Sequence, residues 1–146
     1  MRRTLRLTLD HRSRWGVRTR SRVELSGAWP GAGGRSGGVL FSEQASGGTG
    51  TALRYAVFVA FFRIASYDAR IALSEPALEG ETVSALLIGR GMRYGALLRW
   101  APGAEAALSI RCAVRTRDDV RRLGTGPEEL PGNSELTLEL QADLTL

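Results

Sequence analysis

The chain has 146 residues, which is enough for one domain and too few for two. Charged residues make up 24% and hydrophobic residues 43%, proportions that exclude a disordered chain and a helical membrane protein. The longest charge-free apolar stretch, Tyr55 to Phe62, is far shorter than the roughly 20 residues of a membrane-spanning helix. A membrane protein with this sequence would therefore have to be a β-barrel, because only helices and closed barrels satisfy the backbone in lipid.

The basic residues give a formal net charge of +5, and all 20 of them are arginine. A basic balance of this kind suggests nucleic acid or an anionic membrane surface as a partner. Exclusive use of arginine is also what a GC-rich genome produces, so composition alone does not identify the partner. It has a physical consequence nevertheless, because arginine binds carboxylate and phosphate groups through two parallel hydrogen bonds and lysine cannot.

Cys112 and His11 are the single cysteine and the single histidine of the sequence. One cysteine cannot form an internal disulfide or a cysteine-based metal site. No pair of carboxylates has a spacing that defines a geometry for acid–base catalysis. We therefore expect no enzymatic activity and no metal or other cofactor.

The chain begins with two segments in which apolar and polar residues alternate, the pattern of half-buried β-strands. The first predicted strand covers residues 4–10 and the second covers residues 15–25. Residues 11–14 between them are expected to form a short hairpin connection. The second strand carries a row of arginines on its polar face.

The middle of the chain is divided by glycine. Residues 30–38 are glycine-rich and are predicted to be a flexible loop. A short strand over 39–44 follows, and the glycines of 47–50 break the chain again. Residues 51–63 are largely apolar on both faces, a pattern compatible with a strand or a helix. Their β-branched and aromatic content and the flanking glycines favour a strand.

Alternation continues through the second half of the chain. Four more strands are predicted there: 67–75, 91–100, 107–117 and 135–146. Pro76 ends the first of them, the apolar run 83–88 is left unassigned, and residues 118–133 form a long polar loop. The total is eight or nine strands with hairpin-scale connections, so antiparallel pairing is expected.

The five clearest strands separate charged from apolar residues. Their apolar faces hold twenty-five positions without a charge, and their opposite faces hold twenty-six positions of which fourteen are charged. The charge-free face must contact protein core or lipid, since an arginine at mid-bilayer costs roughly 2–4 kcal/mol. A soluble barrel would turn the same face inward, so alternation alone does not separate the two environments.

Three features favour lipid. The strands run for about ten residues, which is enough to cross a bilayer at barrel tilt. Trp15 and Trp100 lie at strand ends on the apolar face, where aromatic girdles are found. The sequence stops on an amphipathic strand, as the closing strands of membrane barrels do. Met1-Arg2-Arg3 starts like a signal peptide, but no apolar run follows. Either an export signal was removed or the chain is the C-terminal piece of a longer protein, and we favour the second.

In a membrane barrel the two faces have different roles. We predict that seven arginines face the lumen, where they interlock with carboxylates and attract anions: Arg18, Arg20, Arg22, Arg93, Arg99, Arg111 and Arg115. We predict that seven apolar residues face lipid: Leu136, Leu138, Leu140, Leu144, Leu146, Trp15 and Trp100.

Three segments of the second half resemble a known family. Residues 61–71 resemble a strand–turn–strand signature that ends in Tyr-Asp-x-Arg-Ile, and residues 89–94 resemble a strand start of the form Gly-x-Gly-hydrophobic-Arg-Tyr. Residues 123–133 resemble an Ile-Gly-Ser-Gly-x-x-Glu-Ile-x-Gly-Asn loop before a terminal strand. Together they resemble the C-terminal β-barrel region of bacterial envelope proteins that often carry N-terminal helix-hairpin-helix domains. The resemblance implies a non-enzymatic outer-membrane barrel.

We predict an all-β, antiparallel up-and-down β-barrel of about 8 strands, or the C-terminal part of a larger barrel. It would lie in the outer membrane of Gram-negative bacteria and have a structural, anchoring or transport role. Its partners would be membrane lipid, the barrel-assembly machinery and the rest of a larger chain, with anionic ligands as candidates. The alternative is a soluble β-barrel that binds a hydrophobic small molecule in its interior. Nucleic acid is disfavoured, because a single-strand binder needs aromatic residues on the arginine-bearing face and Trp15 is on the other.

Overall fold

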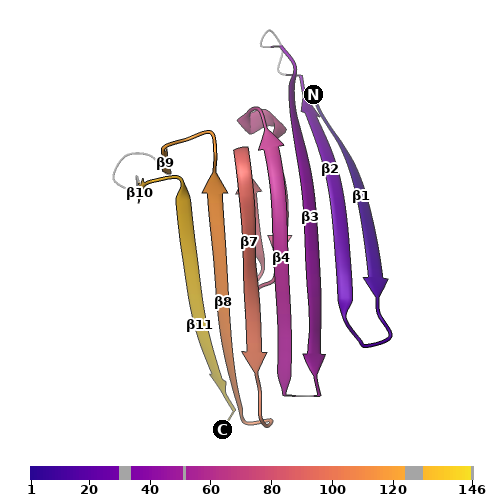
Figure 1. The fold of residues 1–146 in the computed structure, drawn as a ribbon, viewed down its shortest axis with the longest axis vertical. Coiled ribbons are helices and arrows are strands. Elements are labelled where there is room, and N and C mark those ends of the chain that lie inside the picture. Colours follow the sequence, from indigo (N-terminus) through magenta and orange to yellow (C-terminus); the bar gives the residue numbers. More distant parts are fainter. Residues whose placement is uncertain (30–33, 51, 124–129, 146) are drawn as a thin grey trace.

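The computed structural model describes residues 1–29, 34–50, 52–123 and 130–145, and most of them lie in β-strands. Seven strands form one antiparallel sheet in the order β1-β2-β3-β4-β7-β8-β11 (Figure 1). Their bounds are β1 Arg2–Arg12, β2 Arg18–Ala28, β3 Ser36–Thr49, β4 Leu53–Ile64, β7 Gly89–Trp100, β8 Ala106–Arg117 and β11 Ser134–Leu144. No helix within the described ranges is long and apolar enough to cross a membrane.

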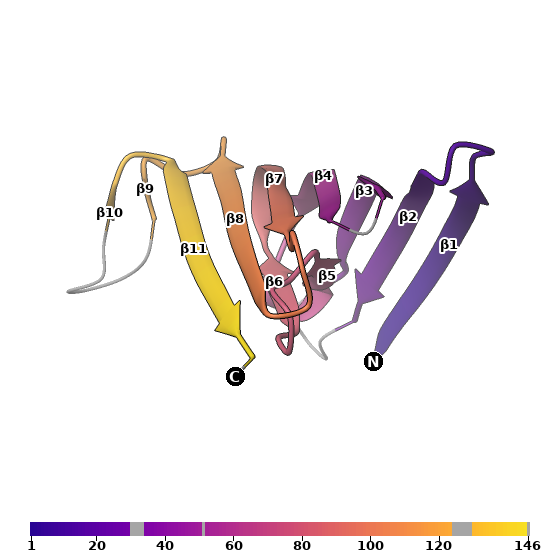
Figure 2. The ribbon, with the colours of Figure 1, turned by 90° about the horizontal axis from the view of Figure 1, so that it is seen from below.

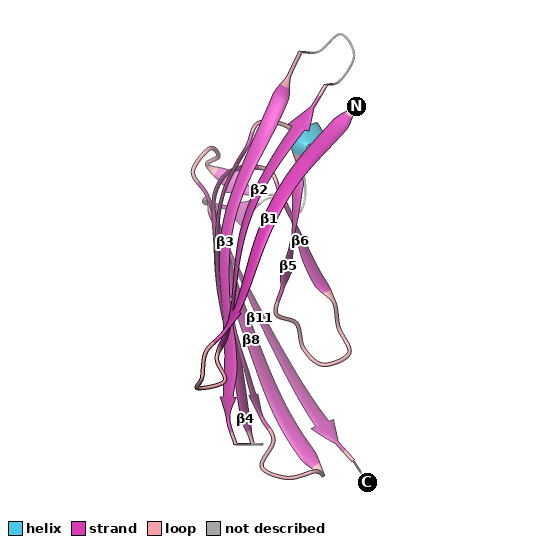
Figure 3. Cartoon of the chain, turned by 90° about the vertical axis from the view of Figure 1, so that its right-hand side faces the viewer, coloured by secondary structure: helices cyan, strands magenta, loops and turns pink. Residues whose placement is uncertain are grey.

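Two further strands leave this sheet and form a hairpin of their own. After a single 3₁₀ turn, η2 (Tyr67–Ala69), strand β5 (Ile71–Glu75) pairs antiparallel with β6 (Val83–Leu87). The large sheet is arched, and Figure 2 shows this β5–β6 hairpin on the inner side of the arch. In the side view the hairpin and the 3₁₀ turn stand off one side of the curved sheet (Figure 3). Short strands β9 (Arg122–Leu123) and β10 (Leu130–Pro131) pair separately.

The hydrophobic core lies between the hairpin and the concave side of the sheet. Phe58 and Phe62 of β4 are buried there in one cluster with Ile71 and Leu73 of β5. The opposite side of β4 turns outward, so that Phe61 is 49% exposed. The two apolar faces of β4 therefore have different causes: one packs on the hairpin, and the other belongs to the convex side of the sheet.

The antiparallel pairing aligns the side chains of all seven strands into two faces. Leu7 of β1 is paired through Val23 and Phe41 with Phe61, and all of these side chains are exposed on the convex face. The residues between them in sequence point to the concave face, because alternate side chains of a strand point to opposite sides of a sheet. The convex face is apolar and the concave face carries most of the charge.

The structure confirms the prediction of an all-β, antiparallel fold. It does not confirm a closed barrel, because β1 and β11 are free edges of the described seven-stranded sheet. Segment 67–75, predicted as one strand, divides into η2 and β5, and the unassigned run 83–88 contains β6. These residues cover the sheet instead of extending it.

The predicted loops are shorter than expected where the structure describes them. The loop over 30–38 was placed too far along the chain, because β3 already begins at Ser36; residues 30–33 lie outside the described ranges. Gly38 fits inside the strand because a Cβ there would lie 2.7 Å from the Ser26 Oγ and 3.0 Å from the Ile64 Cγ1. Glycine here is a packing requirement and not a chain break. The polar loop 118–133 includes β9 and β10, and its residues 124–129 are likewise not described.

Replacing Gly95 of β7 with alanine is expected to destabilise the fold. A Cβ at Gly95 would lie 2.7 Å from the Phe58 ring and even closer to the Cys112 carbonyl oxygen. Overpacking of this kind costs about 1–3 kcal/mol. The free energy of unfolding in urea measures the loss. Gly103→Ala is the matched control, since a Cβ at Gly103 meets nothing within 4 Å and should leave stability unchanged.

Candidate functional site

The concave face gathers arginine side chains from five of the seven strands. β2 contributes Arg18, Arg20 and Arg22, whose pairing partners Arg12, Asp10 and Thr8 alternate on β1 with outward-facing leucines. The later arginines come from two neighbouring strands, with Arg93 and Arg99 on β7 and Arg111 and Arg115 on β8. All seven arginines predicted to face a lumen therefore lie on the face that carries the hairpin.

The most buried part of this face is an ion-pair network around Glu75, at the end of β5. Both Arg93 and Arg111 donate to the Glu75 carboxylate, with Arg93 Nη2 at 3.1 Å and Arg111 Nη2 at 2.6 Å. Arg111 also donates to the Pro76 carbonyl at 2.8 Å and to Glu139 of β11 at 2.7 Å. The side chains of Glu75 and Arg111 are 0% and 2% exposed. A buried carboxylate between two guanidinium groups fixes the hairpin to β7 and β8.

Other polar contacts tie the rest of the hairpin to the sheet. Near the start of β5, Arg22 Nη2 donates to the Ala72 carbonyl at 3.0 Å, and Ser26 donates to the Ala69 carbonyl. Beyond β5, Arg99 forms an ion pair with Glu79. The hairpin is thus held along its length by side chains from both halves of the sheet and has the form of a plug.

An open basic groove remains at the end of the sheet where β1 turns into β2. Its volume is about 870 Å³, and Arg12, Arg18 and Arg54 line it together with Asp10. Asp10 lies 3.7 Å from Arg18 Nε and 2.8 Å from Nε of the neighbouring Arg20. Asp10 is the only acid that lines this described groove, so cationic groups are in excess. A groove of this composition favours anions.

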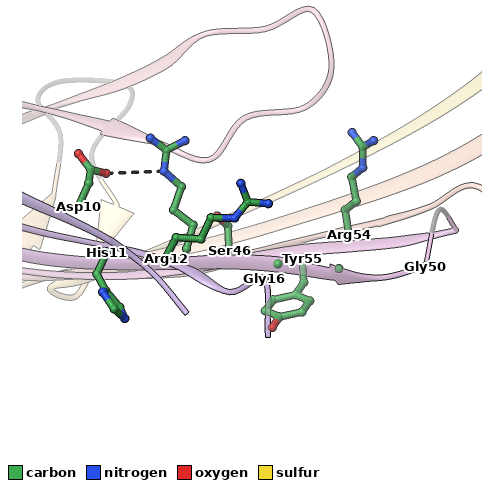
Figure 4. A pocket seen from close by; sticks show the side chains of 11 residues that line it. Asp10, His11, Arg12, Gly16, Ser46, Gly50, Arg54 and Tyr55 are labelled. Carbon is green, nitrogen blue, oxygen red and sulfur yellow. Dashed lines mark ion pairs between the residues drawn. The ribbon is translucent and has the colours of Figure 1, made fainter. Parts of the chain in front are cut away.

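The two sides of the sheet differ clearly at this groove. Figure 4 shows Asp10 and Arg54 on one side of the strands and His11 and Tyr55 on the other. The groove therefore lies at the end of the sheet and is lined from both faces, by Asp10 and arginines on the concave side and by His11 and Tyr55 on the convex side. His11 is exposed at this end of the sheet.

Arg115 of β8 differs from the other six arginines. Its Nε is buried and has no hydrogen-bond partner among the described residues. Arg93 and Arg117 are like-charged neighbours of this side chain, and Glu135 is the acid opposite it on β11. Arg93 and Arg115 are thus directly paired neighbours on β7 and β8, with Glu75 in contact with the first and Glu135 opposite the second.

The convex face carries the predicted apolar residues. Its exposed leucines on β11 are Leu136, Leu138, Leu140 and Leu144. Trp100 lies at the end of β7 and is 52% exposed. Leu146 lies outside the described residues.

Trp15 was wrongly placed on a strand. The Ser13 Oγ accepts hydrogen bonds from the backbone N–H groups of Trp15, at 3.3 Å, and Val17, at 3.2 Å. These bonds form a turn over 13–17, so β2 begins only at Arg18. Trp15 is nevertheless exposed, at the same end of the sheet as Trp100.

Charges interrupt the convex face mainly at one end. Arg3, Arg63 and Arg90 lie on the convex face at the end of the sheet where β1 begins. Trp29 lies at the same end, with its ring centroid 5.8 Å from the Arg3 Cζ. Glu43 of β3 is the exception within the face, on the row of Ser21 and Val59. The separation of charge is therefore strong but less complete than the five clearest strands indicated.

Sequence reasoning missed the residue at the centre of the concave face. Glu75 occupies the third position of an alternating series with Ile71 and Leu73, all buried. A single carboxylate on an otherwise apolar strand face, directly before Pro76, is a signal for a buried ion pair. Arg54, which lines the open groove, was also missed because its strand is apolar on both sides.

The Asp119 carboxylate, just beyond the end of β8, is expected to make a small, pH-dependent contribution to the free energy of unfolding. A hydrogen bond from Arg117 at 2.7 Å lowers the pKa of Asp119; partial burial opposes this, and the Arg90 backbone N–H adds to it. Since the folded state favours the carboxylate, its contribution is present at neutral pH and is lost as the pH falls through the lowered pKa. Asp119→Asn should cost less than about 1 kcal/mol at pH 7 and nothing in strong acid. Urea unfolding midpoints measured at pH 7 and in strong acid test this. The control is Asp68→Asn at an exposed position, which should change neither midpoint.

No group of three histidine, cysteine, aspartate or glutamate side chains in the described part of the chain could hold a metal ion. Comparison with protein-family models, curated protein sequences and solved structures gives no significant match. Function must therefore be inferred from the residues of this chain. The described residues define a curved sheet with an apolar outer face and an arginine-rich inner face that the β5–β6 hairpin covers in part.

Proposed function

We propose that this chain is a membrane β-barrel protein, or a barrel segment, of the Gram-negative outer membrane, with a structural, anchoring or transport role. The observation that carries the proposal is the convex face of the sheet. It is broad, and its leucine, valine and aromatic side chains are exposed within the described chain. Exposed apolar area of this extent is unusual for a soluble monomer and marks an interface with protein or membrane.

The height of this face suits lipid better than a protein partner. On β7 the convex side chains between Arg90 and Trp100 carry no charge. Ten strand residues span about 33 Å along the strand, and a tilt of 35–45° reduces this to about 25 Å, the height of an outer-membrane apolar band. Arginines with Trp29 at one end, and Trp15 with Trp100 at the other, are suitable for the two interfaces.

The inner face suggests what such a barrel would do. The β5–β6 hairpin and its ion pairs fill the middle of the concave face, so an open pore is not the expected product. The remaining basic grooves, lined by Arg12, Arg54 and their neighbours, would attract anions to the rim. An anchoring or structural barrel with an anion-attracting mouth fits these residues, and the barrel-assembly machinery and membrane lipid would be its partners.

A soluble barrel with a hydrophobic interior ligand is less well supported. That function needs apolar side chains on the inner face and a free cavity among them. Here the apolar part of the concave face, Phe58 and Phe62, is already covered by Leu73 and its neighbours on the hairpin. The larger apolar area lies on the outside of the arch.

Cell fractionation followed by a heat-modifiability gel tests the proposed location. We expect the protein in the outer-membrane fraction, extracted by detergent but not by high salt. The folded form should migrate differently on the gel before and after boiling. A protein that stays in solution without detergent and has the same mobility in both lanes overturns the proposal.

A further inference from the structure

A second groove lies at the end of the sheet where β1 begins, and two arginines line its convex side. Its volume is about 730 Å³. Arg63 of β4 and Arg90 of β7 belong to the convex face, whereas Arg117 and Asp119 line the groove from the concave side. Arg117 and Asp119 neutralise each other, with the Arg117 Nη2 2.7 Å from the Asp119 Oδ2. Arg63 and Arg90 therefore give the groove a surplus of positive charge.

Arg63 and Arg90 lie directly opposite each other in the β4–β7 pairing and on the same face. Like charges in this arrangement destabilise a sheet. Arg63 has no hydrogen bond or ion pair among the described residues, and the acid nearest to the Arg90 Nε, Asp118, is 3.7 Å away. Both side chains of that pair are largely exposed, at 65% and 57%, so it compensates little of the charge. An anion held between the two guanidinium groups would remove the repulsion and accept hydrogen bonds from both.

The arginine side of the groove borders the apolar part of the convex face directly. Val39 of β3 is the pairing neighbour of Arg63 and is 42% exposed. In the next row along the strands, Phe61 is paired with Met92, and the Phe61 side chain is 49% exposed. A small soluble anion would use only the charged half of this surface. A ligand that uses both halves must be an amphiphile with an anionic end.

The ring of Trp29 lies on the same face beside the groove. A Cβ at Gly27 of β2 would lie 3.1 Å from the Trp29 Cη2, so the ring covers this glycine. Gly27 is paired with Gly37 of β3, which lines the groove. Tryptophan side chains gather at the level of the lipid head groups in membrane proteins. In the proposed membrane orientation the groove therefore lies at head-group depth, with the apolar band beginning beside it.

We propose that this groove binds the phosphate group of an anionic membrane lipid, whose acyl chains lie along Val39, Phe61 and Met92. The inference rests on the proposed membrane-barrel function and adds a lipid site to it. Arginine suits phosphate because its guanidinium group donates two parallel hydrogen bonds, and basic pockets at the membrane surface hold anionic lipid head groups. The volume lies within the roughly 300–1,000 Å³ of small-molecule sites, so a phosphate with its glycerol backbone fits. The groove of Arg12 and Arg54 lies at the opposite end of the sheet and is a separate site.

Titration of the refolded full chain with dioleoyl phosphatidylglycerol in a neutral detergent tests the site. The midpoint of thermal unfolding is followed against lipid concentration, because a ligand that binds the folded state raises it. We expect a saturable rise for the wild type, and about tenfold weaker binding for Arg63→Gln and for Arg90→Gln, each of which removes one charge-assisted contact. Arg121→Gln is the matched control: it removes the same charge from an exposed position after β8 that does not line the groove. It should bind the lipid as the wild type does.

Inorganic phosphate and dioleoyl phosphatidylcholine are the comparison ligands, and neither should stabilise the wild type over the same concentration range. Inorganic phosphate that is as effective as phosphatidylglycerol would show a site for free anions and would overturn the inference. Equal weakening in Arg63→Gln and Arg121→Gln, or no lipid effect on the wild type, overturns it as well. A wild type that is heat-modifiable and fractionates with the outer membrane leaves the proposed function standing in each of these cases. A protein soluble without detergent overturns the proposed function itself.

Discussion

Glu75→Gln is expected to lose about 3–5 kcal/mol of folding free energy, the cost of leaving buried charge without its partner. The substitution keeps the shape of the side chain but removes the negative charge that Arg93 and Arg111 share. Of the two, only Arg111 contacts a second carboxylate among the described residues, that of Glu139. Urea unfolding followed by tryptophan fluorescence measures the loss. The hairpin between Ser66 and Arg90 should also become accessible to protease at urea concentrations that leave the wild type intact.

Glu81→Gln is the matched control for this experiment. Glu81 lies on the same hairpin, in the exposed connection between β5 and β6, and its removal from the charge balance should change stability by less than about 0.5 kcal/mol. A Glu75→Gln protein that is as stable as the Glu81→Gln protein would show that the hairpin is held by its apolar contacts alone. The ion-pair network would then be a consequence of the hairpin's position and not its cause.

The faces of the sheet were predictable because they depend on local alternation. Leu136 to Leu144 and the arginines of β2 and β8 follow the side-chain period of a strand, and the pairing of neighbouring strands only extends this pattern. The position of the hairpin depends on contacts distant in sequence. Nothing local to residues 71–75 indicates that β5 leaves the sheet and places Glu75 against β7 and β8.

One local signal did point to the hairpin. Both faces of β4 are largely apolar, so each face favours an apolar neighbour outside the sheet. A single open sheet provides no such neighbour on either face. Phe58 and Phe62 meet the hairpin, whereas Val57 and Phe61 remain exposed on the convex face. The residues that remain exposed are thus those for which the chain itself provides no cover, and lipid is the environment that we propose for them.

Leu138→Arg is expected to oppose membrane insertion by roughly 2–4 kcal/mol if the convex face meets lipid near mid-bilayer. Leu138 is 62% exposed on that face, near the middle of β11, so the substitution removes little protein packing. Refolding into phospholipid vesicles, scored by the heat-modifiable band and by co-flotation, measures the effect.

Thr137→Arg places the same charge one residue away on the concave face, between Glu135 and Glu139, where it should be tolerated. The comparison separates the environments of the two faces, because both variants add an arginine to the same strand and differ only in the side to which it points. Equal insertion of the two proteins would contradict a lipid-facing convex surface. If the convex face instead docked on a soluble partner, Leu138→Arg would leave vesicle binding unchanged, since neither variant would associate with lipid.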